Sequence, residues 1–308
     1  MINISPRQLD VFVQIALHGS VRAAAERLYL TQPAASMALA EMERQLDAPL
    51  FARERGRLRL NARGRELLPL AQELLERHAE FGRRGSEGTT VLAGELRIGA
   101  SNTVGNYRVG ELLGAFVRCH AQVAIRLRVA NTETIAAGVL DHRLDVGCVE
   151  GPVTHPLLDV RPWRDDVLVV CTPPDHPLAR KRALKPADFL GARWVMREPG
   201  SATRTLSERA MAQLPAGETV LELDQIEAIK QSVVAGLGIA VLPAVAVTEA
   251  LAAGRLKALK TPFLDLRRKL SIVLHRQKYR GALLDAFLES VEPKADRRQA
   301  RVNENRAT

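Results

Sequence analysis

The 308-residue chain is 46% hydrophobic and 26% charged, a composition that indicates an ordinary globular protein and argues against disorder. Its 44 Lys and Arg residues exceed its 35 Asp and Glu residues, for a formal charge of +9. This charge favours a polyanionic partner or an acidic ligand, although a merely basic protein has the same balance. No signal-peptide pattern and no long apolar stretch is present, so we expect a cytoplasmic protein without membrane contact.

The cysteines and histidines predict neither catalysis nor metal binding. Cys119, Cys148 and Cys171 form no CxxC pair, and we expect buried reduced thiols, with a redox role for Cys148 or Cys171 as a minority alternative. The seven histidines form no HxxxH or HExxH pair, and "GASNTVG" is neither a P-loop nor a GxGxxG motif. We therefore expect no enzymatic activity, no metal and no cofactor.

Three short helices are predicted at the N-terminus. The first follows the cap Ser5, has Gln8 placed for a capping box, and ends at His18-Gly19. Ser20 caps a second helix that runs through Leu28. The third is "TQPAASMALAEMERQL", in which Thr31 is the cap.

The third helix has the pattern of a DNA recognition helix. Ala35, Leu39, Met42 and Leu46 recur at helical spacing and should face inward. Polar side chains at the start of such a helix can reach base edges in the major groove. The residues left on the opposite face of its first turns are Gln32, Pro33, Ser36 and Met37.

A strand-turn-strand unit rich in arginine should follow, in "FARERGRLRLNARGRE". Its arginines would lie against phosphates or in a minor groove, although each alone reads equally well as a solvated surface charge. They are Arg53, Arg55, Arg57 and Arg59, grouped around Gly56.

The segment from "FVQIALHGS" to "LRLNARG" resembles the winged helix-turn-helix of LysR-type transcriptional regulators. Its Ala-rich second helix, the Thr-Gln-Pro-Ala opening and Pro-Leu-Phe-x-Arg after the third helix carry the resemblance. Met37 and "NAR" depart from the commoner residues of the family, so base specificity does not transfer. The resemblance implies that double-stranded operator DNA contacts Gln32, Pro33, Ser36, Met37, Arg53, Arg55 and Arg57.

A linker helix is predicted from Ala62 to about Gly85, before the glycine-rich hinge "RRGSEGTTVLAGE". A heptad-like seam on it calls for a partner chain, unless it packs on the chain's own C-terminal domain. The resemblance favours a homodimer, and further a homotetramer. The residues of this seam are Leu67, Ala71, Leu74, His78 and Phe81.

Beyond Gly94, short apolar strands alternate with amphipathic helices, which indicates parallel sheets covered on both faces. Turn-rich breaks near "RPWRDD" and "FLDLRRK" suggest two lobes. The expected fold is α/β: an α-rich winged helix-turn-helix (1–60), a linker helix (61–87) and a two-lobed, periplasmic-binding-protein-like domain (92–292), with a disordered tail (293–308). Lobe 1 would comprise 92–162 and 268–292, and lobe 2 163–267.

Polar residues that follow these strands are expected to line a cleft for an effector. Ser101 and Ser201 are read either as parts of an anion site or as simple helix caps. Glu150 would repel an anion unless Arg197 neutralises it or the ligand brings a donor; a purely structural role is equally open. The full candidate set is Ser101, Asn102, Thr103, Asn131, Thr132, Glu150, Arg197, Ser201, Thr203 and Arg204.

Within the family, "GASNTVGNYRVGELLGAF", "VEGPVTHP" and "REPGSATR" resemble the branch of carbon-fixation and sulfur- or sulfite-responsive regulators. The resemblance implies a small-molecule effector, an oxyanion or carboxylate. The alternatives are a redox-sensing regulator of the same fold and a solute-binding protein without a DNA function.

Overall fold

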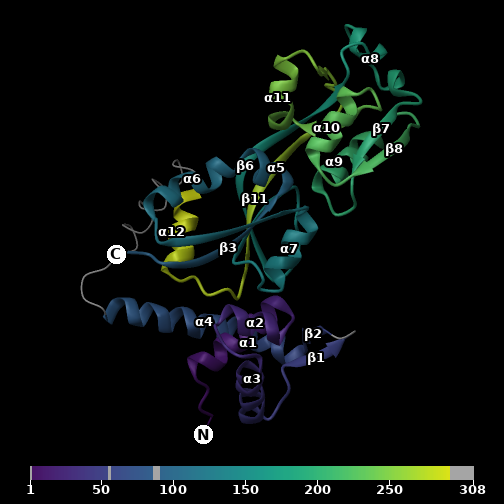
Figure 1. Cartoon of the computed structure of the whole chain (residues 1–308). Helices are drawn as coiled ribbons and strands as arrows, with labels where there is room; N and C mark the ends of the chain where they lie inside the picture. Colours follow the sequence, from purple (N-terminus) through teal and green to yellow (C-terminus); the bar gives the residue numbers. More distant parts are fainter. Residues whose placement is uncertain (1, 55–56, 86–90, 292–308) are drawn as a thin grey trace.

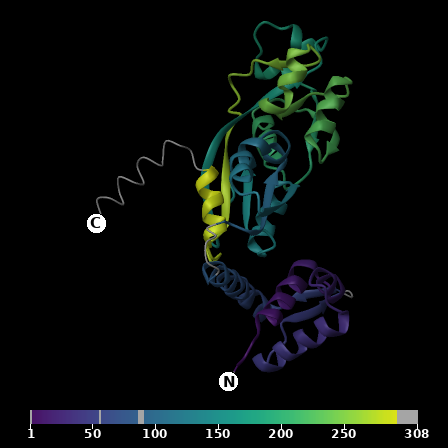
Figure 2. The same ribbon diagram turned by 60° about the vertical axis from the view of Figure 1, so that its left-hand side comes forward.

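The computed structural model describes residues 2–54, 57–85 and 91–291. Figures 1 and 2 show three parts in a row: an N-terminal domain, a long helix beneath the middle of the molecule, and a C-terminal domain of two lobes. The last described helix returns to the lobe nearer the N-terminal domain, so the chain crosses between the lobes twice.

The N-terminal domain has the helices that the caps predict. Ser5 and Gln8 form the capping box, since the Gln8 N–H donates to Ser5 Oγ (3.3 Å) and the Ser5 N–H to Gln8 Oε1 (2.7 Å). Ser20 and Thr31 cap the next two helices through their hydroxyls. The elements are α1 (Pro6–His18), α2 (Val21–Arg27), α3 (Gln32–Leu46) and an antiparallel hairpin of β1 (Phe51–Glu54) and β2 (Arg57–Leu60).

The linker helix α4 (Ala62–Gly85) continues through Pro69. The predicted seam is partly wrong, because Ala71 is buried and Leu67 half-buried against the chain's own N-terminal domain. Leu74 and Phe81 of that seam are exposed instead, together with Leu70. One face of α4 therefore belongs to the chain's own fold, while an apolar stripe on another face lies uncovered.

Lobe 1 is a sheet with helices on both faces. β3 (Gly94–Ser101) lies between and parallel to β4 (Val123–Ala130) and β5 (Val146–Glu150). The helices α6 (Val109–Cys119) and α12 (Ala282–Val291) bury Phe116 and Phe287 on one face, and α7 (Thr132–Leu140) buries Ile135 on the other. The short α5 (Asn102–Tyr107) follows β3 directly.

Two long strands connect the lobes. β6 (Leu158–Thr172) and β11 (Arg267–His275) pair antiparallel, and β11 also pairs antiparallel with β5. The sheet is therefore mixed, and the expectation of purely parallel sheets is wrong. The break predicted at "RPWRDD" is also wrong, because β6 runs through these residues; a register shift opposite Leu270/Ser271 accommodates Pro162, which has no N–H to donate.

Lobe 2 has its own two hydrophobic clusters, around Trp194 and Ile229. Two of its strands, β8 (Glu218–Leu223) and β10 (Lys257–Leu259), carry no continuous apolar run and so do not stand out in the sequence. Its elements are α8 (Pro177–Arg180), a 3₁₀ turn (Pro186–Phe189), β7 (Arg193–Arg197), α9 (Ala202–Met211), β8 (Glu218–Leu223), α10 (Ile226–Val234), β9 (Ala240–Pro243), α11 (Ala244–Ala252) and β10 (Lys257–Leu259).

The join between α4 and the N-terminal domain depends on Gly64. A Cβ at this position would lie 2.1 Å from the Leu50 carbonyl oxygen, which is backbone and cannot rotate away. We expect Gly64→Ala to lower the free energy of unfolding by about 1–3 kcal/mol, measured as a lower urea midpoint. Gly110→Ala is the matched control, because a Cβ there meets no atom of the described residues within 4 Å. Equal midpoints for the two variants would contradict the close packing at Gly64.

Candidate functional site

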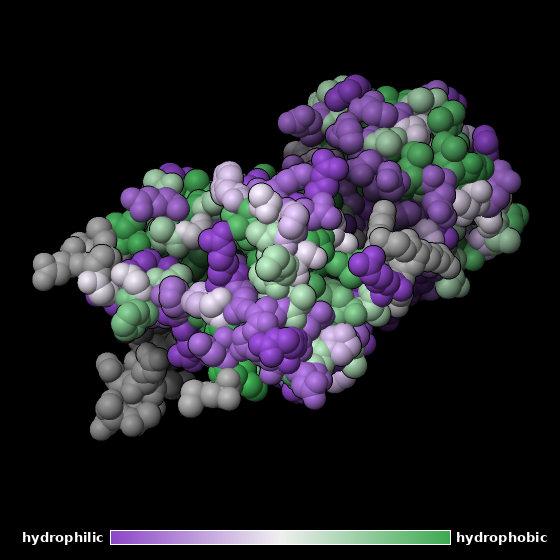
Figure 3. All heavy atoms as spheres, turned by 60° about the horizontal axis from the view of Figure 1, so that its bottom comes forward, coloured by the Kyte–Doolittle hydropathy of each residue, from purple (hydrophilic) through white to green (hydrophobic). Residues whose placement is uncertain are grey.

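The start of α3 presents a polar surface to solvent. Ala35 and Leu39 are buried against α1 and α2, which fixes the helix in the domain. Gln32, Pro33 and Ser36 are exposed, and Met37 is 72% exposed. Figure 3, in which the bottom of Figure 1 comes forward, shows hydrophilic residues over much of this side of the molecule, with hydrophobic ones scattered among them. The face is available to a polar partner such as the major groove.

The hairpin packs beside this helix through Phe51 and Leu58, and of its arginines Arg53 and Arg59 have described side chains, both exposed. Arg53 is an exposed residue of β1, and Arg57 begins β2. Arg55 lies outside the described residues. An exposed arginine on a hairpin next to a recognition helix suits contact with phosphates.

The two lobes meet at a buried ionic network centred on Glu150, at the end of β5, and this lobe junction is where the sequence predicted a cleft. Its carboxylate accepts hydrogen bonds from the Thr103 N–H (2.6 Å), the Thr203 hydroxyl (3.1 Å) and Arg268 Nη1 (2.7 Å). Burial alone would raise the pKa of Glu150, but Arg268 and these hydrogen bonds outweigh it and lower the pKa. Glu150 is therefore ionised at neutral pH inside the protein.

Arg268 uses all three guanidinium nitrogens in this network. Nε donates to Asp166 Oδ2 (2.8 Å), its direct cross-strand partner on β6. Nη1 donates to Thr203 as well as to Glu150, and Nη2 donates to the Thr103 hydroxyl (3.0 Å). Thr103 belongs to lobe 1 and Thr203 to lobe 2, so one side chain bridges both lobes.

Two buried donors at the cleft remain without a well-aligned acceptor among the described residues. Ser101 Oγ, at the end of β3, lies near Glu150 but makes no well-aligned hydrogen bond, and it does not cap α5. Arg197 Nη1, at the end of β7, is also unpaired, although the side chain is only 3% exposed. Unpaired buried donors are costly, so such atoms mark places where a ligand acceptor would be stabilising.

Of the remaining candidates, Asn131 bonds between the lobes, and the others bond within one lobe. The Asn131 carboxamide accepts from the Thr134 N–H and donates to the Pro199 carbonyl across the cleft (3.3 Å), and the Glu133 N–H donates to the Gly200 carbonyl. Thr132 donates to the Glu150 carbonyl, and Asn102 accepts from Asn106. Ser201 accepts from the Arg204 N–H at 3.4 Å, so Ser201 is a helix cap.

The sequence left open whether Arg197 neutralises the charge of Glu150. Arg197 does not neutralise Glu150, because its guanidinium pairs with the adjacent Glu198 at 2.7 and 2.9 Å. Arg204 is directed away to Glu208 and Glu222. The cation that pairs with Glu150 is Arg268, which the turn-rich pattern of "FLDLRRK" did not indicate.

Cys148 and Cys171 are in surroundings that disfavour a reactive thiolate. Cys148 and Cys171 are buried, and burial raises the pKa of both thiols, that of Cys171 to about 12. Cys119 is exposed and forms no disulfide with the other two.

No group of three or more His, Cys, Asp or Glu side chains in the described ranges is arranged to hold a metal ion. None of the helices that the structure describes is long and apolar enough to cross a membrane.

An exposed recognition helix, joined by one long helix to a two-lobed domain with a buried polar cleft, defines a DNA-binding regulator with a ligand-binding domain. Residues 6–65 match the model of the bacterial regulatory helix-turn-helix protein, lysR family. Residues 89–296 match that of the LysR substrate binding domain. The chain therefore belongs to the LysR family of transcriptional regulators, as the sequence resemblance predicted.

Two named relatives and one solved structure agree with this family assignment. The chain is 37% identical over 293 residues to the uncharacterized HTH-type transcriptional regulator YeiE of Escherichia coli K12, covering 95% of this chain and 98% of that one. It is 32% identical to the RuBisCO operon transcriptional regulator of Allochromatium vinosum, covering 98% and 100%. The CcmR regulatory domain of Synechocystis PCC6803, solved with 2-PG, matches at 28% identity with a TM-score of 0.59, covering 64% of this chain and 95% of that one.

The buried network predicts a large difference between two adjacent arginines. Arg268→Met leaves Glu150 buried without its cation and leaves Asp166 with only the more distant Arg108 (3.9 Å), and we expect a loss of about 3–5 kcal/mol in unfolding free energy. Arg267→Met removes only an exposed pair with Asp265 and should cost less than about 1 kcal/mol. Urea unfolding of both variants tests this. If Arg268→Met were no less stable than Arg267→Met, Arg268 would not hold the lobes together.

Proposed function

We propose that this regulator closes its two lobes on a small effector that carries an oxyanion or carboxylate group. The observation that supports this most directly is the pair of buried donors without well-aligned acceptors, Ser101 Oγ and Arg197 Nη1, at the ends of a strand from each lobe. An acid group would supply the missing acceptors. The relative CcmR was solved with 2-PG, which makes 2-PG a rational first compound to test.

The charges around these donors favour an effector that carries a hydrogen-bond donor in addition to its acid group. Arg268 is matched by Glu150 and Asp166, and Arg108 lies 3.9 Å from the Asp166 carboxylate. Arg108 also pairs with Glu111 at 2.9 Å, so these two cations are matched by at least as many carboxylates and leave no net positive charge to attract a simple anion. An effector with an acid group and a hydroxyl or other donor would satisfy Ser101 and Arg197 while also bonding to Glu150.

Effector binding would act by shifting a conformational population. Arg268 and Asp166 lie on the two strands that pass between the lobes, so a ligand that changes their contacts changes the relation of the lobes. To regulate, the effector must bind one arrangement of the DNA-bound assembly more tightly than the other.

A homodimer through α4 is part of the proposal, and a tetramer could be built from two such dimers. Leu70, Leu74 and Phe81 are 53%, 54% and 79% exposed along one stripe of this helix. An exposed apolar stripe at helical spacing is a typical helix-pairing surface. Two-fold symmetry would then give an operator with two half-sites.

A redox-sensing regulator and a solute-binding protein without a DNA function are less well supported. A redox sensor needs an accessible thiol of low pKa, whereas Cys148 and Cys171 are buried with raised pKa values. A solute-binding protein has no use for the N-terminal domain. We propose that the chain acts without catalysis, in the cytoplasm, where its operator DNA would be.

The recognition face predicts two distinguishable DNA-binding defects. Gln32→Ala should cost about 1–3 kcal/mol of discrimination between operator and random duplex, because Gln32 would contact a base edge. Arg53→Ala should weaken binding to both duplexes similarly and reduce the salt slope by about one, because Arg53 would contact a phosphate. Fluorescence anisotropy on a selected operator and a random duplex measures both. Equal losses of Gln32→Ala on the two duplexes would contradict base readout.

The cleft predicts which variants lose effector binding. In a thermal-shift panel of sulfate, sulfite, phosphate, 2-PG and shikimate, the compound that raises the melting temperature of the full chain should fail to do so for Ser101→Ala and Thr203→Ala. Both variants should keep their DNA affinity in the absence of that compound. The control is Ser232→Ala, whose hydroxyl bonds only within α10, to the Ala228 carbonyl. Unchanged stabilisation of both cleft variants would place the site elsewhere.

A further inference from the structure

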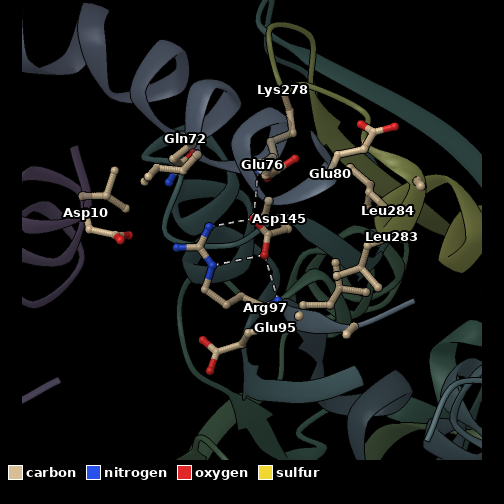
Figure 4. Close-up of a pocket in the computed structure, with 18 of the residues that line it drawn as sticks. Asp10, Gln72, Glu76, Glu80, Glu95, Arg97, Asp145, Lys278, Leu283 and Leu284 are labelled. Carbon is tan, nitrogen blue, oxygen red and sulfur yellow. Dashed lines mark hydrogen bonds and ion pairs between the residues drawn. The ribbon is translucent and has the colours of Figure 1, made fainter. Parts of the chain in front are cut away.

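A second cavity lies where α1, α4 and lobe 1 meet, and effector binding in the cleft does not use it (Figure 4). Its volume is about 320 Å³, at the lower end of the range of small-molecule sites. Apolar side chains from all three parts line it: Val13 and Leu17 from α1, Leu75 from α4, and Leu283 and Leu284 from the start of α12.

Two buried polar atoms at this cavity have no partner among the described residues: Gln72 Oε1 and Arg97 Nη1. Gln72 is 5% exposed, and its amide nitrogen is held by the His142 carbonyl at 3.1 Å. Arg97 is fixed by Asp145, which accepts from Nη2 at 2.6 Å and from Nε at 3.1 Å. In Figure 4 the unpaired nitrogen of Arg97 points to the side of the cavity where Gln72 and Asp10 lie.

Gln72 Oε1 is a hydrogen-bond acceptor, and Arg97 Nη1 is a hydrogen-bond donor. Each side chain is fixed by the hydrogen bonds of its other nitrogens, which Gln72 makes to the His142 carbonyl and Arg97 to Asp145. A buried acceptor and donor without partners are costly, and a ligand head group that offers both complements would satisfy them together. A primary amide has this combination, since its oxygen accepts and its NH₂ group donates.

The charges around the cavity favour an uncharged ligand. Lys278 pairs with Glu76 (2.7 Å) and Asp145 (3.2 Å), and Arg97 pairs with Asp145. Of the other acidic side chains, Glu80 pairs with Arg84 and Glu95 with Arg126. Asp10 and Arg83 also line the cavity with opposite charges, and burial raises the pKa of Asp10. Because these charges balance, a charged ligand would meet no opposite net charge to offset the free-energy cost of removing it from water.

We propose that this junction cavity is a second small-molecule site, for an uncharged amphipathic ligand with a primary amide or equivalent donor-acceptor head. The head would accept from Arg97 Nη1 and donate to Gln72 Oε1. Its apolar body would pack on Leu17, Leu75 and Leu283. A ligand held this way contacts the N-terminal domain, the linker and lobe 1 at once, and so fixes their relative positions.

Pairing of two chains through α4 leaves the site open. The cavity-lining residues of the helix are Gln72, Leu75, Glu76, Ala79, Glu80 and Arg83, which lie on one face of it. The exposed apolar stripe of Leu70, Leu74 and Phe81 falls about half a turn away from them. The two surfaces therefore do not compete.

Isothermal titration of the full chain with three matched probes tests the proposal. The probes are 3-phenylpropanamide, 3-phenylpropanoate and 3-phenylpropylammonium, which share one apolar body and differ in head-group charge. We expect the amide to bind at least tenfold more tightly than either ion. No detectable amide binding, or equal binding of the three probes, would overturn the proposal.

Variants locate the binding. Gln72→Leu should weaken amide binding at least tenfold, and Leu283→Trp, which fills the cavity, should abolish it. Ala79→Phe fills the same cavity from α4, in case Leu283→Trp fails to fold. The bulk control is Leu190→Trp, at a position 73% exposed in lobe 2. Ser101→Ala should bind the amide as the parent chain does, whereas loss of binding in that variant, or unchanged binding in Gln72→Leu and the filled variants, would overturn the junction site.

Discussion

The arrangement of the C-terminal domain depends on one buried guanidinium. Arg268 lies on a strand that passes from one lobe to the other, opposite Asp166 on the second such strand, and it also binds Glu150. A buried cation is tolerated only when its hydrogen bonds and its charge are satisfied, and here Thr103 and Thr203 supply the remaining partners. Because these partners come from both lobes, Arg268 has all of its hydrogen bonds only when the two lobes are in contact as they are in this structure.

The same strand geometry connects the cleft with the linker helix. β3 ends at Ser101 in the cleft, and four residues earlier Arg97 joins the network of Asp145, Lys278 and Glu76 that reaches α4. Four residues of strand span about 13 Å. β3 is therefore a short, stiff element with a buried ionic network at each end, one where the lobes meet and one beside α4.

Local signals allowed most of the fold to be predicted from sequence. Ser5, Ser20 and Thr31 cap helices through contacts within three residues, and apolar runs marked strands such as β3 and β9. The centre of the cleft could not be predicted in this way. Arg267 and Arg268 are the same residue type in the same polar stretch, and alternation along β11 exposes the first and buries the second. Only the pairing with Asp166, 102 residues earlier in the chain, distinguishes them. Gln72 and Arg97 were missed for the same reason.

The buried networks also refine what the net charge means. The formal charge of +9 was compatible with either a polyanionic partner or an acidic ligand. Arg268 and Arg108 in the cleft, and Arg97 and Lys278 at the junction, all lie beside carboxylates of at least equal number. Neither buried network therefore contributes to the excess. The surplus cations belong to the rest of the chain, where a long-range field attracts DNA phosphates, while ligand selection inside depends on hydrogen-bond geometry.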